Sequence, residues 1–285
     1  MPTRLPVHVV EPAATHTHTA IFLHGRGDNG SDFAEELFAS GISDGTGVVA
    51  SETQTPAPAQ APTTTLRTRF PLWRWVFPSA PNRWSTAFQL GGAAQNVVLG
   101  GISQGAAVGL WALLGLLAPG QPGAELIPRL GAFVGVSCWL PFVSAAGKYL
   151  PGVGVDEPSK EGSIPGSNVA DSTTTDSITD ITITYNGCSQ DFVRSMLKGA
   201  RILSSIASHG IRDHPFLTTP VFLGHGTDDA YVDVSLGRQT KEVLSGMGFQ
   251  VTWKEYVGAE QEGHWYKEPE ELDDIARFLS AMATA

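Results

Sequence analysis

The pentapeptide Gly-Ile-Ser-Gln-Gly at residues 101–105 constrains the fold of this chain more than any other feature. The apolar run 97–99 precedes it, and the long apolar stretch 106–117 follows it. The first pattern is typical of a buried strand and the second of a buried helix. A serine between two glycines at such a junction indicates the sharp turn known as a nucleophile elbow. The sequence therefore predicts that Ser103 lies between a central strand and a core helix.

Apolar segments with strand and helix patterns alternate along the whole chain. Such alternation indicates a mostly parallel sheet with helices on both faces. Residues 1–285 are long enough for one large α/β domain, and no second domain is required. Ser31 is the expected N-cap of the first helix. The strands are expected at 19–23, 73–77, 97–100, 132–138, 221–223 and 251–256, and the helices at 29–38, 106–117, 234–245 and from Pro269 onward.

Two polar segments interrupt this pattern. Residues 50–66 are rich in Thr, Pro, Ala and Gln, and residues 148–214 are rich in Ser, Thr, Gly and Pro. Such compositions cannot fill a core, so both segments are predicted to be insertions at the surface. The apolar residues Phe192, Met196 and Ile202 have helical spacing, so the second insertion is expected to be partly helical.

Charge and composition exclude several classes of protein. The net charge of -10 argues against nucleic acid or an anionic membrane as the main partner. No apolar segment approaches the roughly 20 residues of a membrane-spanning helix, and the N-terminus does not resemble a secretory signal. Cys138 and Cys188 fit a reducing compartment, and a disulfide between them is not favoured. His and Cys do not cluster as metal ligands, and we expect no metal and no cofactor.

The catalytic candidates follow from the chemical needs of a serine nucleophile. A serine hydroxyl is a weak nucleophile at neutral pH and needs a base within hydrogen-bond reach. His264 follows the strand 251–256 and precedes the last helix, a place that suits a general base. Asp229, after the strand 221–223, is the expected partner that orients the imidazole. Asp228 is the alternative, less favoured because Asp-x-x-Val places the carboxylate of Asp229 at the turn.

Further residues are assigned to the stabilisation and binding of a substrate. The backbone N–H groups of Arg26 and Gln104 are expected to form an oxyanion hole, and the start of the helix after Ser103 adds a favourable dipole. Trp139, Leu140 and Trp265 are expected to line the substrate pocket, Trp265 because it follows His264 directly.

On these residues the chain resembles the phospholipase/carboxylesterase family, which includes acyl-protein thioesterases and lysophospholipases. The resemblance implies an α/β-hydrolase fold and the triad Ser103, Asp229 and His264. It also implies a cytoplasmic location and the hydrolysis of carboxylic esters or thioesters through an acyl-enzyme, without a cofactor. The implied substrates include S-acylated proteins and lysophospholipids. The matching segments occur in family order at 23–30, 77–81, 99–106, 137–141, 224–232 and 251–264.

Three features depart from the family pattern. The connection 84–96 is too short to supply the usual covering helix, the insertion 148–214 is extra, and the acidic tripeptide 260–262 directly precedes Gly263 and His264. The short connection motivates an alternative, a catalytically impaired hydrolase-fold protein that binds acylated partners. A serine peptidase is a third and weaker interpretation.

Overall fold

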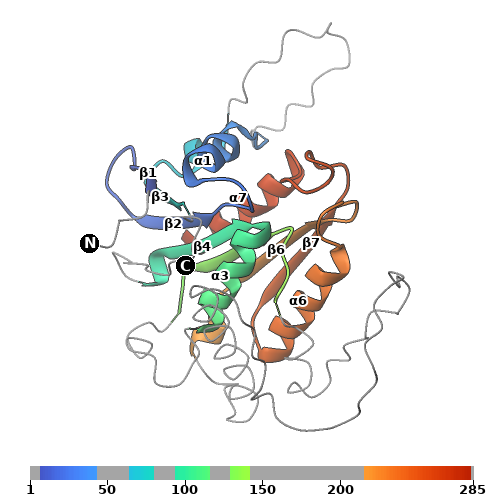
Figure 1. Cartoon of the computed structure of the whole chain (residues 1–285). Helices are drawn as coiled ribbons and strands as arrows, with labels where there is room; N and C mark the ends of the chain where they lie inside the picture. The colour runs from blue at the N-terminus through green and yellow to red at the C-terminus, as the bar shows by residue number, and fades with distance from the viewer. Residues whose placement is uncertain (1–6, 44–63, 80–93, 116–128, 142–214, 284–285) are drawn as a thin grey trace, which may run out of the picture.

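A computed structural model describes residues 7–43, 64–79, 94–115, 129–141 and 215–283 (Figure 1). Within these ranges a seven-stranded sheet has the order β1-β3-β2-β4-β5-β6-β7. The edge strand β1 is antiparallel to β3, and every other neighbouring pair is parallel. The strands are β1 (Val7–Val10), β2 (His18–Leu23), β3 (Trp73–Pro78), β4 (Val97–Ile102), β5 (Ala132–Val136), β6 (Val221–Gly226) and β7 (Val251–Tyr256).

Helices cover both faces of the sheet, because its central strands are apolar on both sides. One face packs against α1 (Gly30–Ala39), the short α2 (Leu66–Arg69) and α7 (Glu270–Ala283). The other packs against α3 (Ser103–Gly115) and α6 (Val234–Met247). Two short 3-10 helices, η1 (Ala94–Asn96) and η4 (Pro215–Thr218), precede β4 and β6. Each face has its own hydrophobic cluster, and β4 and β5 separate the two.

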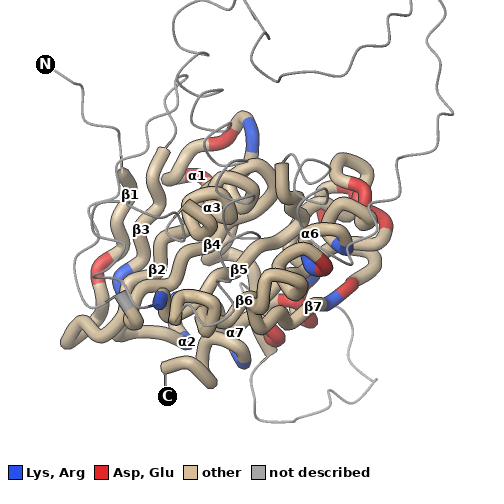
Figure 2. Tube along the Cα trace, turned by 90° about the horizontal axis from the view of Figure 1, so that it is seen from below, with Lys and Arg blue, Asp and Glu red and all other residues tan. Residues whose placement is uncertain are grey.

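Charged residues lie at the outer strands and in the loops, and few lie along the central strands (Figure 2). At one edge Arg74 pairs with Glu11 at 2.9 Å, and at the other Arg238 pairs with Glu255 at 2.7 Å. The hydrogen bonds from Arg238 lower the pKa of Glu255 to about 2. No helix in the described ranges is both long and apolar enough to cross a membrane.

The α/β-hydrolase fold predicted from the sequence is confirmed, and its element boundaries need small corrections. The strand β1 was not expected, and the helix predicted at 106–117 begins earlier, at Ser103. Asn29, not Ser31, caps α1, because its side-chain oxygen accepts hydrogen bonds from the backbone N–H groups of residues 31 and 32. The strand predicted at 132–138 ends at Val136, since Ser137 has a left-handed φ of 46°.

The predicted insertions lie largely outside the described residues. This applies to all of 148–214, including its predicted helical part, and to 50–63, as well as to residues 84–93 of the short connection. The end of the first segment is described: Thr65 caps α2, and Leu66 is fully buried. Polar composition therefore does not extend to the last residue of that segment, which packs in the core.

Candidate active site

Ser103 occupies a strained turn between β4 and α3, with a φ of 54°. A non-glycine residue in the left-handed region persists only where its surroundings enforce it. Here the two flanking glycines allow β2 to approach closely. A Cβ atom at Gly101 would lie 2.6 Å from the carbonyl oxygen of Leu23, and one at Gly105 would lie 2.3 Å from the same atom. The strand, turn and helix expected at residues 101–105 are therefore present.

The loop that follows β2 passes beside this turn. A Cβ atom at Gly25 would lie 3.7 Å from the Cβ of Ser103. The ring of His24 donates a hydrogen bond from Nδ1 to the carbonyl oxygen of Gly25 at 2.7 Å. Arg26 and Gln104, the expected sources of oxyanion N–H groups, line the same cavity as Ser103. The structure thus brings both segments to the serine.

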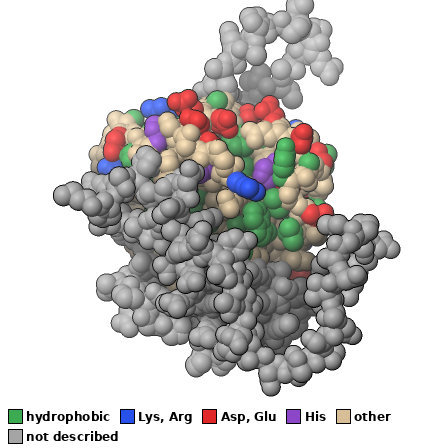
Figure 3. Space-filling view, viewed as in Figure 1, with side chains coloured by type: hydrophobic (Ala, Val, Ile, Leu, Met, Phe, Trp, Pro, Cys, Tyr) green, Lys and Arg blue, Asp and Glu red, His purple; other side chains and the backbone are tan. Residues whose placement is uncertain are grey.

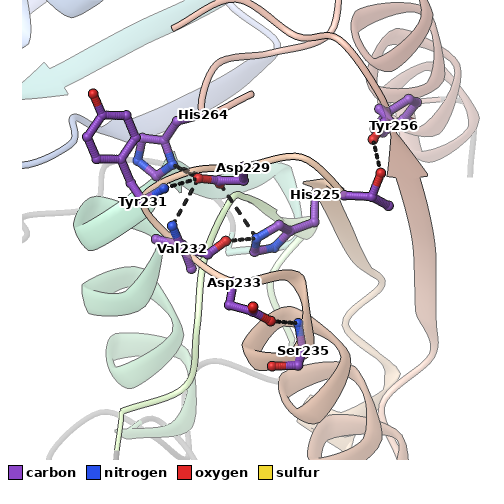
Figure 4. Close-up of polar contacts among 9 residues, drawn as sticks. His225, Asp229, Tyr231, Val232, Asp233, Ser235, Tyr256 and His264 are labelled. Carbon is purple, nitrogen blue, oxygen red and sulfur yellow. Dashed lines mark hydrogen bonds and ion pairs between the residues drawn. The ribbon is translucent and has the colours of Figure 1, made fainter. Parts of the chain in front are cut away.

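His264 and Asp229 form a direct hydrogen-bonded pair (Figure 4). The Nδ1 atom of His264 lies 2.9 Å from Oδ1 and 2.8 Å from Oδ2 of Asp229. Because a carboxylate only accepts hydrogen bonds, Nδ1 carries the proton and donates it. The neutral ring is then held in the tautomer whose Nε2 atom is free to accept a proton.

Asp229 is held in turn by the backbone of its own loop. Its Oδ1 atom accepts hydrogen bonds from the N–H groups of Tyr231 at 2.8 Å and Val232 at 2.9 Å. Burial raises the pKa of Asp229, but the hydrogen bonds from His264, Val232 and Tyr231 outweigh burial, so the pKa lies below its usual value. The carboxylate is therefore ionised at neutral pH, as an orienting partner must be.

The neighbouring Asp228 has a different partner. Its Oδ2 atom accepts a hydrogen bond from the backbone N–H of Gly258 at 2.8 Å, which links the loop after β6 to the loop after β7. Of the two adjacent acids, Asp229 is therefore the one that the fold brings to His264.

The extra residues before His264 form a compact left-handed turn. Gln261, Glu262 and Gly263 have φ values of 49°, 57° and 82°. The carbonyl oxygen of Glu262 accepts a hydrogen bond from Ala230 N at 3.0 Å, which ties this turn to the Asp229 loop. The acidic tripeptide therefore packs against the Asp229 loop and does not separate His264 from Asp229.

A cavity of about 750 Å³ joins these groups. Ser103 and His264 both line it, although no hydrogen bond joins the two side chains in the described structure. Catalytic hydrogen bonds often tighten only when substrate is bound. The full lining comprises Gly25, Arg26, Gly27, Asp28, Glu36, Ile102, Ser103, Gln104, Trp139, Tyr231, Val232, Gln261, His264 and Trp265.

The predicted pocket residues divide into two groups. Trp139 and Trp265 line the cavity. Leu140 does not: it is buried in the core on the α6 side, and its backbone N–H donates to the hydroxyl of Thr240 at 2.8 Å. The described structure therefore places Leu140 in the core and not in the lining of the cavity.

Tyr231 is a lining residue that the sequence reasoning missed. Its side chain is 67% exposed, and its ring centroid lies 5.2 Å from that of His264. Its place within the matched segment 224–232 was the available signal, but an exposed loop aromatic gives no pattern of its own. His225 also lies beside Asp229, with its Nε2 atom 3.6 Å from Oδ2.

The face shown in Figure 3 has few basic side chains. Acidic side chains spread over its upper part, and hydrophobic side chains gather beside a basic side chain and a histidine.

Among the described residues, no group of three or more His, Cys, Asp or Glu side chains is arranged to hold a metal ion. Cys138 is a buried free thiol, and burial raises its pKa to about 12.

Comparisons with known proteins match this fold and part of the sequence. The family model described as Phospholipase/Carboxylesterase matches residues 193–283. Acyl-protein thioesterase 1 of Gibberella zeae is 43% identical over 61 residues, which are 21% of this chain and 24% of that protein. The aligned part thus spans about a quarter of that relative.

Two crystal structures share the fold over nearly the whole length. Acyl-protein thioesterase 2 of Zea mays has a TM-score of 0.53 and 20% identity, covering 98% of this chain and 100% of that one. Esterase PE8 has a TM-score of 0.52 and 15% identity, with the same coverage of 98% and 100%. The chain therefore has an α/β-hydrolase fold, and its resemblance to the phospholipase/carboxylesterase family is confirmed.

Proposed function

We propose that this chain is a serine hydrolase of carboxylic esters or thioesters that acts through an acyl-enzyme. One observation carries the proposal: a serine in a strained strand-to-helix turn lines the same cavity as a histidine whose Nδ1–H is bound by a buried carboxylate. Nucleophile, base and orienting acid come from three different loops. An arrangement of this kind supports acyl transfer better than simple binding.

In the proposed reaction Ser103 Oγ attacks the acyl carbonyl while Nε2 of His264 takes the hydroxyl proton. The negative charge that develops on the carbonyl oxygen is stabilised by the backbone N–H groups of Arg26 and Gln104. His264 then returns the proton to the leaving alcohol or thiol. A water molecule attacks the acyl-enzyme by the same route, which releases the carboxylic acid and restores Ser103. Asp229 stays ionised throughout and stabilises the imidazolium.

The proposed substrates are acyl esters and thioesters, including S-acylated proteins and lysophospholipids. The tryptophan walls at Trp139 and Trp265 suit an apolar acyl group. The similar proteins of Gibberella zeae and Zea mays carry the name acyl-protein thioesterase, which supports the thioester class. A cytoplasmic location belongs to the same proposal, since the free thiol Cys138 fits a reducing compartment.

The test is hydrolysis of p-nitrophenyl esters from acetate to palmitate by the wild-type chain and its Ser103→Ala variant. We expect turnover by the wild type and its loss in the variant, and the best chain length would indicate the size of the acyl site. A fluorophosphonate probe should label the wild type at Ser103 alone. A folded wild type that neither turns over nor reacts with the probe would favour the alternative, an impaired protein that binds acylated partners.

A further inference from the structure

A second histidine lies behind the acid of the site. His225, near the end of β6, is fully buried, and its ring is on the opposite side of Asp229 from His264 (Figure 4). Its Nε2 atom lies 3.6 Å from Oδ2 of Asp229, while Nδ1 of His264 lies 2.8 Å from the same oxygen. The carboxylate is therefore placed between two imidazoles, and the mechanism above uses only one of them.

The hydrogen bonds of His225 fix its proton. Nε2 lies 2.8 Å from the carbonyl oxygen of Val232, which can only accept, so Nε2 carries the hydrogen. Nδ1 is buried and has no hydrogen-bond partner among the described residues. Burial lowers the pKa of His225, against the opposing effects of the Val232 carbonyl and the charge of Asp229. The ring is therefore neutral, with a single N–H directed at the Asp229 loop.

The N–H of His225 makes the second of two hydrogen bonds that hold the backbone of Val232. The backbone N–H of Val232 donates to Asp229 at 2.9 Å, and its carbonyl oxygen accepts from His225 at 2.8 Å. Val232 is thereby held from both sides, by the carboxylate that needs orienting and by a ring attached to the central sheet. Without the second contact, the turn 229–232 would lose a hydrogen bond to a β6 side chain and keep only the longer 3.6 Å approach of Asp229 to His225.

The protein also makes room for this ring. A Cβ atom at Gly237, on α6, would lie 2.5 Å from Nδ1 of His225 and 2.7 Å from the ring of Trp253. The absence of a side chain at this helical position allows α6 to pack directly on the imidazole. The contact is tight enough that a methyl group there would displace the His225 ring.

We propose that His225 is a positioning residue, whose N–H holds the Val232 carbonyl and so fixes Asp229 in the orientation that binds His264. The inference rests on the proposed function and adds a residue to it. His225 does not touch substrate or exchange a proton in the reaction. It acts through Val232 and Asp229.

The test compares His225→Gln with His225→Leu in the full chain. The Nε2 amide of Gln reaches about as far as the imidazole Nε2 and can donate to Val232, whereas Leu fills similar volume without a donor. Outer partners that orient a functional imidazole typically contribute about 10- to 100-fold. We expect His225→Leu to lower kcat by about 10- to 100-fold with little change in KM, and His225→Gln to restore most of it.

A spectroscopic readout separates positioning from mere stability. The Nδ1 proton of His264 shared with Asp229 should give a downfield proton resonance in the wild type and in His225→Gln. In His225→Leu it should move upfield or broaden. If His225→Leu lowers the melting temperature but leaves kcat and this resonance unchanged, the inference is overturned and His225 is only a packing residue.

A second variant tests the inference even if His225→Leu does not fold. Gly237→Ala keeps the histidine at position 225 but displaces its ring from the Nδ1 side, so it should lower kcat and shift the same resonance. Wild-type kcat and an unshifted resonance in a folded Gly237→Ala variant would also overturn the inference. Absence of turnover and of fluorophosphonate labelling in the wild type would instead overturn the proposed function, so the two failures are distinguishable.

Discussion

The two halves of the candidate site are held in place by different physical means. The Ser103 turn is fixed by backbone packing: β2 approaches Gly101 and Gly105 so closely that no side chain fits. Backbone segments also come close beside Asp229 and His264, since a Cβ atom at Gly226 would lie 2.3 Å from the carbonyl oxygen of Gly263, but the two side chains themselves are oriented by hydrogen bonds from side chains and loop N–H groups. Steric constraint tolerates no substitution, while a hydrogen-bonded loop can lose a contact and keep its fold. We therefore expect changes at the first half to destabilise the protein and changes at the second to lower its activity.

Position in the sheet accounts for this difference. The strand β4, which leads to Ser103, is buried along its whole length between β2 and β5. The strand β7, which leads to His264, is the edge strand and has no fully buried residue. The turn after a central strand is fixed because the strand packs against neighbours on all sides. The residues after an edge strand have fewer neighbours, so hydrogen bonds within and between loops must hold them.

After the loss of turnover expected for Ser103→Ala, the largest effect on activity is expected from Asp229→Asn. An amide of the same shape keeps the loop but can no longer fix the imidazole tautomer, and comparable changes cost about 10⁴-fold in kcat. Asp228→Asn is the matched control, since its carboxylate binds Gly258 N and not His264. We expect at most about a threefold change there. Steady-state kinetics of both variants, with circular dichroism to confirm folding, checks this. Equal losses in the two variants would contradict the assignment of the acid.

The largest effect on stability is expected from Gly105→Ala. The new Cβ atom would lie 2.3 Å from the carbonyl oxygen of Leu23 and 2.4 Å from that of His24, so the backbone must move. We expect a loss of at least about 3 kcal/mol in the free energy of unfolding, measured by urea denaturation. Gly115→Ala in the same helix is the control: no described residue lies within 4 Å of its Cβ, and it should stabilise by about 0.5–1 kcal/mol. If Gly105→Ala leaves the free energy of unfolding unchanged, steric constraint does not fix the Ser103 turn, and the contrast between the two halves of the site is wrong.

The same contrast explains why some elements could be predicted from the sequence. The buried strands β4 and β6 and the Ser103 turn follow from apolar runs and glycine spacing, because burial leaves few alternatives. The exposed edge strand β1, with only four residues, has no comparable pattern and was missed.

At the loops the sequence supplied residue types but not directions. It favoured Asp229, which hydrogen-bonds His264, over Asp228, which binds Gly258, yet it placed Leu140 beside Trp139 in a cavity whose lining includes only Trp139 of the two. The left-handed φ values of Gln261 and Glu262 have no signal in their residue types. Loop geometry depends on contacts between distant segments, which composition and spacing do not encode.

The free energy of unfolding should depend on pH because of a buried carboxyl group in the half of the protein that contains His264. Glu271, at the start of α7, is fully buried, and its Oε2 atom accepts a hydrogen bond from Lys267 N at 2.9 Å. Burial raises the pKa of Glu271 to about 8; the charge of Asp274 adds to this, and the Lys267 hydrogen bond opposes it. The folded state therefore keeps a proton that the unfolded state releases between about pH 4.5 and 8, and the contribution of Glu271 to stability falls as pH rises through that window.

Glu271→Gln should remove this contribution. Between pH 6 and 8 the wild type should lose more stability than the variant, by up to about 1.4 kcal/mol per pH unit. Urea denaturation at pH 6 and 8 measures the difference. Glu270→Gln, at the exposed neighbouring position, should follow the wild type. A Glu271→Gln slope identical to that of the wild type would show that the carboxyl group is ionised in the folded protein.

The smallest effect is expected at Tyr231, although its ring touches the base. Its backbone N–H, which every substitution except proline retains, holds Asp229 at 2.8 Å, whereas its side chain packs on His264 from the solvent side and hydrogen-bonds with Glu262. Aromatic contacts of this kind contribute about 0.5–1.5 kcal/mol, so Tyr231→Ala should lower kcat/KM by about 2- to 10-fold, and Tyr231→Phe should be close to wild type. Val257→Ala is the control, at an equally exposed side chain (67%) that does not line the cavity. A loss in Tyr231→Ala as large as that in Asp229→Asn would mean that the side chain, and not only the backbone, of this loop holds the acid–base pair in place.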